Sequence, residues 1–87
     1  MSEPRRMLVV AMGNRVEGLR VAVGLTMADA ALRVAVWGDP PTDDAATPQL
    51  EALEFGEVAV QALPAGDDAS WDALAHQIID SDIVYCL

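Results

Sequence analysis

The sequence predicts a single α/β domain spanning residues 1–87, built as a three-layer sandwich around a four-stranded parallel sheet. Two observations predict this fold class. Short apolar runs alternate along the chain with segments of helical periodicity, which is typical of parallel strands joined by helices. The length of 87 residues suits one domain, and the sequence shows no internal repeat, linker or low-complexity tract.

The first strand is predicted at residues 6–12, where RMLVVAM forms an unbroken apolar run before Gly13. A helix is expected from Arg15 to about Leu32, because this stretch lacks proline and carries apolar residues at helical spacing. One apolar stripe consists of Val16, Leu19, Val23, Met27 and Ala30. A second stripe includes Val21 and Leu25, so we expect this helix to face both the sheet and a neighbouring subunit.

Three further strands follow the same logic. Residues 33–38, RVAVWG, form the second, residues 57–63, EVAVQAL, the third, and residues 83–87, IVYCL, the fourth. Thr47 and Pro48 resemble an N-cap and first helical residue, and Gly56 resembles the C-cap of that helix. Asp68 or Ser70 is expected to cap the last helix.

The simplest topology for this βαβαβαβ chain is the flavodoxin-like strand order 2-1-3-4. Each crossover helix returns the chain to the same edge of the sheet, so all strands are expected to be parallel. Ligands of such sheets bind outside the carboxyl ends of the strands.

Composition limits the partners and the location of the protein. It is 53% hydrophobic, which is high for a small domain and predicts a homo-oligomer, whether dimer, trimer or hexamer. The net charge is −9, and eleven acids follow Val34, which argues against nucleic-acid binding. No apolar stretch suits a membrane span or a signal peptide, and a single cysteine excludes a disulfide framework, so we expect a cytoplasmic protein.

The loop after the first strand is one candidate ligand site. Gly13, Asn14 and Arg15 occupy the turn into the first helix, where a helix N-terminus beside an arginine can hold an anion or a nucleotide. The segment GNRVEG is neither a P-loop nor GxGxxG, and the chain contains no lysine. The alternative is an ordinary turn between a strand and a helix.

Other polar residues fit a solvated surface better than a site. Asp39, Asp43 and Asp44 lack the spacing of an EF-hand, so we predict no metal site and no cofactor. The chain also lacks the acids and the lysine that a receiver domain needs at its strand ends. His76 has no serine or second histidine with which it could form a nucleophilic constellation.

Cys86 is the one candidate catalytic residue. A cysteine in a buried strand usually behaves as a small hydrophobe. A reactive thiolate needs positive charge nearby, whereas Asp80 and Asp82 precede Cys86 in the sequence. In the order 2-1-3-4, Arg15 would stand about 10 Å from Cys86, which is two strand spacings. Both interpretations of Cys86 stay open at this point.

Nearly the whole chain resembles the DsrE/DsrF/DsrH family of small sulfur-relay proteins, and its length is similar to that of DsrH-like members. The resemblance rests on the alanine-rich first helix, on VAVWGDP, on EVAVQALPAGDD and on WDALAHQIIDSDIVYCL. It implies a parallel α/β subunit that assembles into trimers, hexamers or mixed complexes with related subunits, and some members carry persulfide on a cysteine after the third strand. Here that segment is ALPAGDDAS, which has no cysteine.

Three functional hypotheses follow from the resemblance and from the residues. The first is an oligomeric subunit or binding module that is connected with sulfur metabolism and has no catalysis of its own. The second is a sulfurtransferase that carries persulfide on Cys86. The third is an anion or nucleotide binder that uses Gly13, Asn14 and Arg15.

Overall fold

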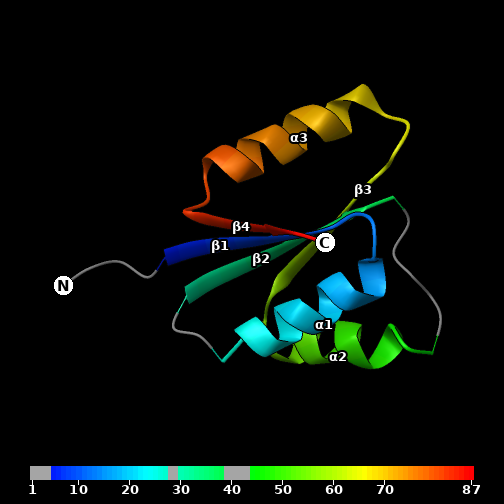
Figure 1. Ribbon diagram of the computed structural model, residues 1–87, viewed down its shortest axis with the longest axis vertical. Helices are drawn as coiled ribbons and strands as arrows, with labels where there is room; N and C mark the ends of the chain where they lie inside the picture. Colours follow the sequence, from blue (N-terminus) through cyan, green and yellow to red (C-terminus); the bar gives the residue numbers. More distant parts are fainter. Residues whose placement is uncertain (1–4, 28–29, 39–43) are drawn as a thin grey trace.

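A computed structural model describes residues 5–27, 30–38 and 44–87 of the chain (Figure 1). Its strands are β1 (Arg5–Ala11), β2 (Ala30–Trp37), β3 (Ala59–Leu63) and β4 (Ile83–Cys86). Its helices are α1 (Arg15–Leu25), α2 (Thr47–Phe55) and α3 (Asp68–Ile79). Every strand pair is parallel, which confirms the α/β class and the four-stranded parallel sheet.

The strand order is β3-β2-β1-β4, so the predicted order 2-1-3-4 is wrong. The reason lies in the helices. Helix α2 packs beside α1 on the same face of the sheet, and this arrangement carries β3 outward past β2. The chain then crosses the opposite face through α3 and returns beside β1 as β4 (Figure 1). This is the order of the first four strands of the doubly wound dinucleotide-binding sheet.

Strand β1 is the centre of the core. Its residues from Met7 to Ala11 are all buried, and it pairs with both β2 and β4. Val9 and Ala11 belong to the apolar cluster beneath α1 and α2, whereas Leu8 and Val10 belong to the cluster that contains Leu74 of α3. A helical layer therefore covers each face of the sheet, as Figure 1 shows.

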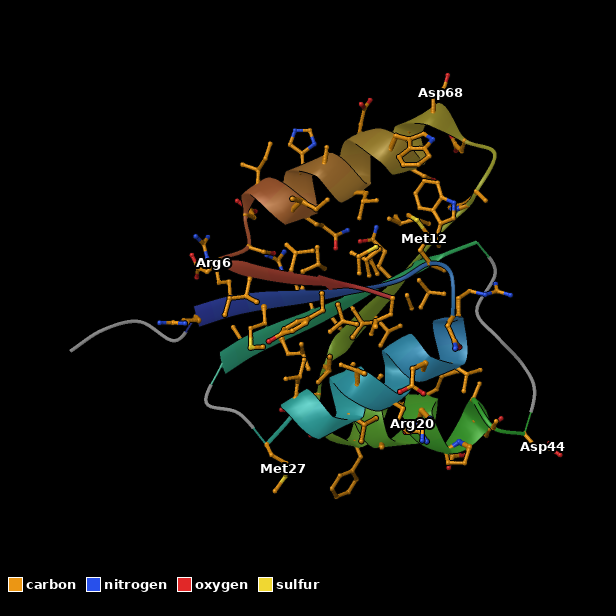
Figure 2. All side chains as sticks on the ribbon, in the orientation of Figure 1. Arg6, Met12, Arg20, Met27, Asp44 and Asp68 are labelled. Carbon is orange, nitrogen blue, oxygen red and sulfur yellow. The ribbon has the colours of Figure 1, made fainter. Side chains whose placement is uncertain are left out.

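The first helix is shorter than the sequence predicts. Helix α1 ends at Leu25, the Thr26 hydroxyl donates to the Val23 carbonyl over 2.6 Å, and β2 already begins at Ala30. The strand takes residues expected in the helix because Arg5 to Ala11 of β1 align with Ala30 to Val36 in an unbroken parallel register. Met27 consequently lies beyond the helix with its side chain exposed (Figure 2).

The second apolar side of α1 has a partner within the same chain. Leu25, from the second stripe, packs against the cluster that includes Leu53 of α2. Helix α2 therefore covers part of the side of α1 that was expected to face a neighbouring subunit.

The helix caps lie close to their predicted positions. Gly56 is the C-cap of α2, as predicted. Helix α2 starts one residue earlier than expected, with Ala46 rather than Thr47 as N-cap. At α3 the capping side chain belongs to Asp67, which accepts from the Ala69 N–H over 2.9 Å, rather than to Asp68 or Ser70.

A small polar junction holds the start of β4 against β1. The Arg6 N–H donates to the Asp82 carboxylate over 2.8 Å, and the Asp82 N–H donates to the Arg6 carbonyl over 2.7 Å. The side chains of these two residues also form a solvent-exposed ion pair at 3.8 Å. These contacts lie directly before the first register pair of the two strands, Met7 with Ile83, and hold the start of β4 in that register.

Helix α1 approaches β1 closely at Gly18. A Cβ atom added to Gly18 would lie 2.7 Å from the Ala11 Cβ and 3.0 Å from its Cα. Both residues are buried, so a larger side chain has no free space to enter. Gly24 in the same helix has nothing within 4 Å of an added Cβ.

These two glycines give a matched test of the packing. We expect Gly18→Ala to lower the free energy of unfolding by about 1–3 kcal/mol, because the new methyl group forces α1 away from β1. Gly24→Ala should leave it unchanged or raise it by up to about 1 kcal/mol, because alanine favours a helix. Urea unfolding of both variants measures the difference, and equal effects at the two positions would contradict the close approach.

Candidate functional site

The observed strand order creates a topological switch point between β1 and β4. The chain leaves β1 toward β2 on one side, and β4 lies on the other. In open α/β sheets, ligands bind outside the carboxyl ends of the strands at such a point. Here that location comprises residues 12–15 after β1 and residues 86–87 at the end of β4, and we call it the switch-point site.

The main-chain oxygen of Leu87 occupies part of the switch-point site. It accepts from the Met12 N–H and from the Gly13 N–H, each over 2.8 Å. The Leu87 N–H in turn donates to the Val10 carbonyl over 3.0 Å. Gly13 was predicted to help bind a ligand, and the structure shows its N–H bonded to the protein itself.

The N-terminus of α1 also has partners within the chain. Asn14 is its N-cap, and the Asn14 side-chain oxygen accepts from the Glu17 N–H over 3.2 Å. The Glu17 carboxylate lies in the first turn of the helix and binds the Arg20 guanidinium. A carboxylate at this position already interacts favourably with the positive end of the helix dipole.

Arg15 extends from the end of β1 toward the end of β2. A Cβ atom added to Gly38 would lie 3.6 Å from Nη1 of Arg15, so the guanidinium passes close to this glycine. Gly38 has a φ of 87°, which favours glycine, and its N–H donates to the Leu63 carbonyl over 2.7 Å. Arg15 therefore reaches the side of β1 that faces away from β4.

Cys86 lies next to β1, one strand spacing away rather than the two spacings expected from the order 2-1-3-4. Its register partner is Val10, and its side chain is exposed. Because Val10 faces the α3 side of the sheet, Cys86 faces that side too. The structure brings the main chain of β4 to the Gly13 loop but does not bring the Arg15 guanidinium to the Cys86 thiol.

An aromatic pair lies at the carboxyl edge on the α3 face. The rings of Trp37, at the end of β2, and Trp71, in α3, have centroids 4.3 Å apart and planes inclined by 49°. Met12 packs against the same apolar cluster as Trp37 and lies near the carboxyl end of the sheet (Figure 2). Trp71 remains 56% exposed.

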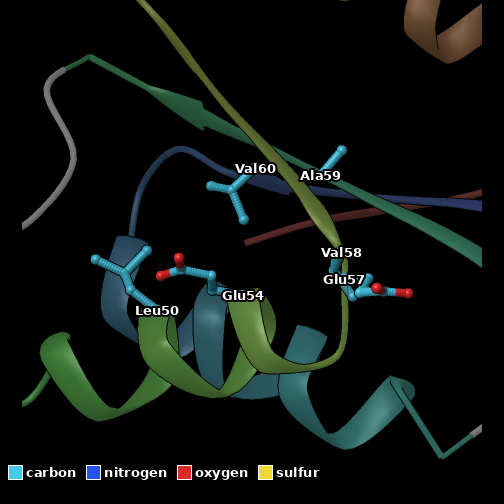
Figure 3. A pocket seen from close by; sticks show the side chains of 6 residues that line it. All are labelled: Leu50, Glu54, Glu57, Val58, Ala59 and Val60. Atoms are coloured by element: carbon cyan, nitrogen blue, oxygen red, sulfur yellow. The ribbon is translucent and has the colours of Figure 1, made fainter.

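A separate open hollow of about 520 Å³ lies between α2 and the beginning of β3 (Figure 3). Leu50, Val58 and Val60 provide apolar walls, and Glu54 and Glu57 also line it. Figure 3 shows the two carboxylates pointing in different directions, so they do not form a pair for acid–base chemistry. This hollow is at the amino end of β3, away from the switch-point site.

The remaining candidates from the sequence are surface residues or fall outside the described structure. Asp39 and Asp43 lie outside the described residues, and Asp44 is exposed. His76 is exposed, and its Nδ1 lies 2.8 Å from the Asp72 carbonyl of its own helix. Within residues 5–27, 30–38 and 44–87, no group of three metal-ligating side chains occurs, and no helix is long and apolar enough to cross a membrane.

Comparisons with known proteins place the chain in no family. No family model, no curated protein and no solved structure matches it. The switch-point site therefore has to be interpreted from its own geometry.

Two features of this edge were not found from the sequence. The Leu87 oxygen is a main-chain group, so only the adjacency of β1 and β4 reveals its role. The contact between Trp37 and Trp71 needs α3 to cross the face toward which Trp37 points. The sequence did indicate which face Trp37 lies on. Trp37 comes two residues after Ala35 on one strand, so the two side chains share a face of the sheet.

The structure gives Asn14 a testable role as a helix cap. Replacing Asn14 with Ala should lower the free energy of unfolding by about 1 kcal/mol, because the Glu17 N–H loses its side-chain acceptor. Asn14→Asp keeps an acceptor oxygen and should lower the free energy of unfolding much less. Thermal or urea unfolding compares the two variants, and equal stability of Asn14→Ala and the wild type would argue against the cap.

Proposed function

We propose that the chain is a DsrE-like subunit without catalysis of its own, which works within an assembly as a binding module connected with sulfur metabolism. The observation that carries the proposal is the concentration of exposed large apolar side chains on β4 and α3. Val84, Tyr85 and Leu87 are exposed at the end of the sheet. Trp71, Ile78 and Ile79 are exposed on α3.

The setting of Cys86 supports the absence of independent catalysis. Arg15, the basic residue within the switch-point site, extends toward Gly38 on the other side of β1. The segment that follows β3 contains no cysteine where sulfur-carrying relatives of the resembled family have one. A reactive thiolate needs a stabilising positive group close by.

The assembly part of the proposal is tested by the mass of the protein in solution. We expect light scattering coupled to size-exclusion chromatography to give a mass of at least two chains of 9.2 kDa each, because the exposed apolar residues favour association. A strictly monomeric protein across the accessible concentration range would overturn the proposal.

A second candidate function is a persulfide carrier, and the exposure of the Cys86 thiol favours it. In this reaction the Cys86 thiolate attacks the outer sulfur of a donor persulfide. The sulfur–sulfur bond of the donor breaks, the donor leaves as a thiolate, and Cys86 becomes a persulfide with no net oxidation or reduction.

Intact mass measurement separates the two functions. After incubation with a donor persulfide, the second candidate predicts a gain of one sulfur atom that Cys86→Ser abolishes. The folded chain must also gain sulfur on Cys86 faster than a peptide with the sequence of residues 81–87 does. This peptide is the control for the intrinsic reactivity of the thiol. Our first proposal predicts loading of the folded chain no faster than that of the peptide.

A further inference from the structure

Strand β4 is one edge of the sheet that the described residues form. Leu87 donates its N–H to Val10, and its oxygen accepts from Met12, so both groups point toward β1. The direction of these groups alternates along a strand. The N–H and carbonyl groups of Tyr85 therefore also point toward β1. Those of Val84 and Cys86 point outward from the described sheet.

This edge lacks the features that normally prevent pairing with another strand. Ile83–Cys86 contains no charged residue and no proline, and Val84 and Tyr85 are exposed on opposite faces. The other edge, β3, is interrupted before its start by Glu57 with a φ of 60° and after its end by Pro64. Of the two edges, β4 is the one suited to pairing.

We propose that β4 pairs antiparallel with β4 of a second copy of this chain, about a twofold axis through Tyr85. This inference rests on the assembly part of the proposed function and identifies the partner and the contact. The outward-pointing residues Val84 and Cys86 are symmetric about Tyr85. The axis therefore pairs each Val84 with Cys86 of the second copy, and the outward groups can form four main-chain hydrogen bonds.

The distribution of charge favours this register. Two copies with a net charge of −9 repel each other over most of their surfaces. The proposed contact joins two uncharged strands and places the two Asp82 residues at its opposite ends. Each Asp82 is three residues from the axis, so the two are separated by six residue steps along the strands, or about 20 Å. At ordinary salt this separation exceeds the screening length of about 10 Å.

The pairing also changes the surroundings of Cys86. On the α3 face, Cys86 lies beside Val84 of the second copy, and on the opposite face the two Tyr85 side chains are directly opposed. Tyrosine pairs at such non-hydrogen-bonded positions are favourable. The second copy thus covers the open side of the thiol with an apolar residue.

Disulfide cross-linking tests the register. In a Cys86→Ser background, Tyr85→Cys places the Cα atoms of the two introduced cysteines about 4.5 Å apart, so mild oxidation should link the dimer. Val84→Cys in the same background is the control, because its diagonal separation of about 7–8 Å is too long. Val84→Cys with Cys86 retained should link again, since these positions are directly opposed at about 5.5 Å.

A proline variant tests the edge itself. Val84→Pro removes an outward N–H while leaving every hydrogen bond between β1 and β4 intact, so the fold should survive, as circular dichroism can check. We expect its dimer dissociation constant to rise at least about tenfold, whereas Val84→Thr keeps the N–H and should stay dimeric.

The outcomes separate this inference from the proposed function. A monomeric wild type would overturn both. A wild-type oligomer in which Val84→Pro associates normally and Tyr85→Cys fails to cross-link would overturn only the β4 contact. Cross-linking at Tyr85 and Val84 in the stated pattern, together with a monomeric Val84→Pro, would support it.

Discussion

The burial of β1 on both faces is the constraint on which the rest of the structure depends. Each neighbour of this strand and each helical layer contacts it, and its residues from Met7 to Ala11 divide alternately between the two apolar clusters. Gly18 allows α1 to approach Ala11 on one face. The Arg6–Asp82 junction aligns β4 at the amino end of the strand, and the Leu87 oxygen holds the loop at its carboxyl end.

This constraint explains why the candidate ligand site is constructed from main-chain groups. The last strand lies beside β1, so the Leu87 oxygen meets the N–H groups of Met12 and Gly13. The Asn14 side chain accepts from the Glu17 N–H at the start of α1, and Arg15 extends to Gly38. The edge that could hold an anion is thus used in part for internal contacts.

The elements of the fold could be predicted from the sequence, but their order could not. The apolar run before Gly13 marks a doubly buried strand, and the structure confirms it. Strand order depends on which face each crossover helix covers, and both α2 and α3 carry apolar residues that would suit either face. The site could not be predicted for the same reason. The expected distance from Arg15 to Cys86 depended on the strand order, and that order was wrong. Val21 and Leu25 indicated a second apolar side of α1, but they did not indicate that Leu25 packs against the cluster that includes Leu53 of α2.

The central claim is that β4 borders β1 and offers Val84 and Cys86 outward to a second copy. Amide hydrogen exchange, followed by NMR at several protein concentrations, tests it most directly. We expect the Tyr85 and Leu87 amides to be protected at every concentration, because they bond to β1, and the Val84 and Cys86 amides to gain protection as the concentration rises. Rapid exchange at Val84 and Cys86 at all concentrations, or loss of protection at Tyr85 and Leu87, would contradict the account.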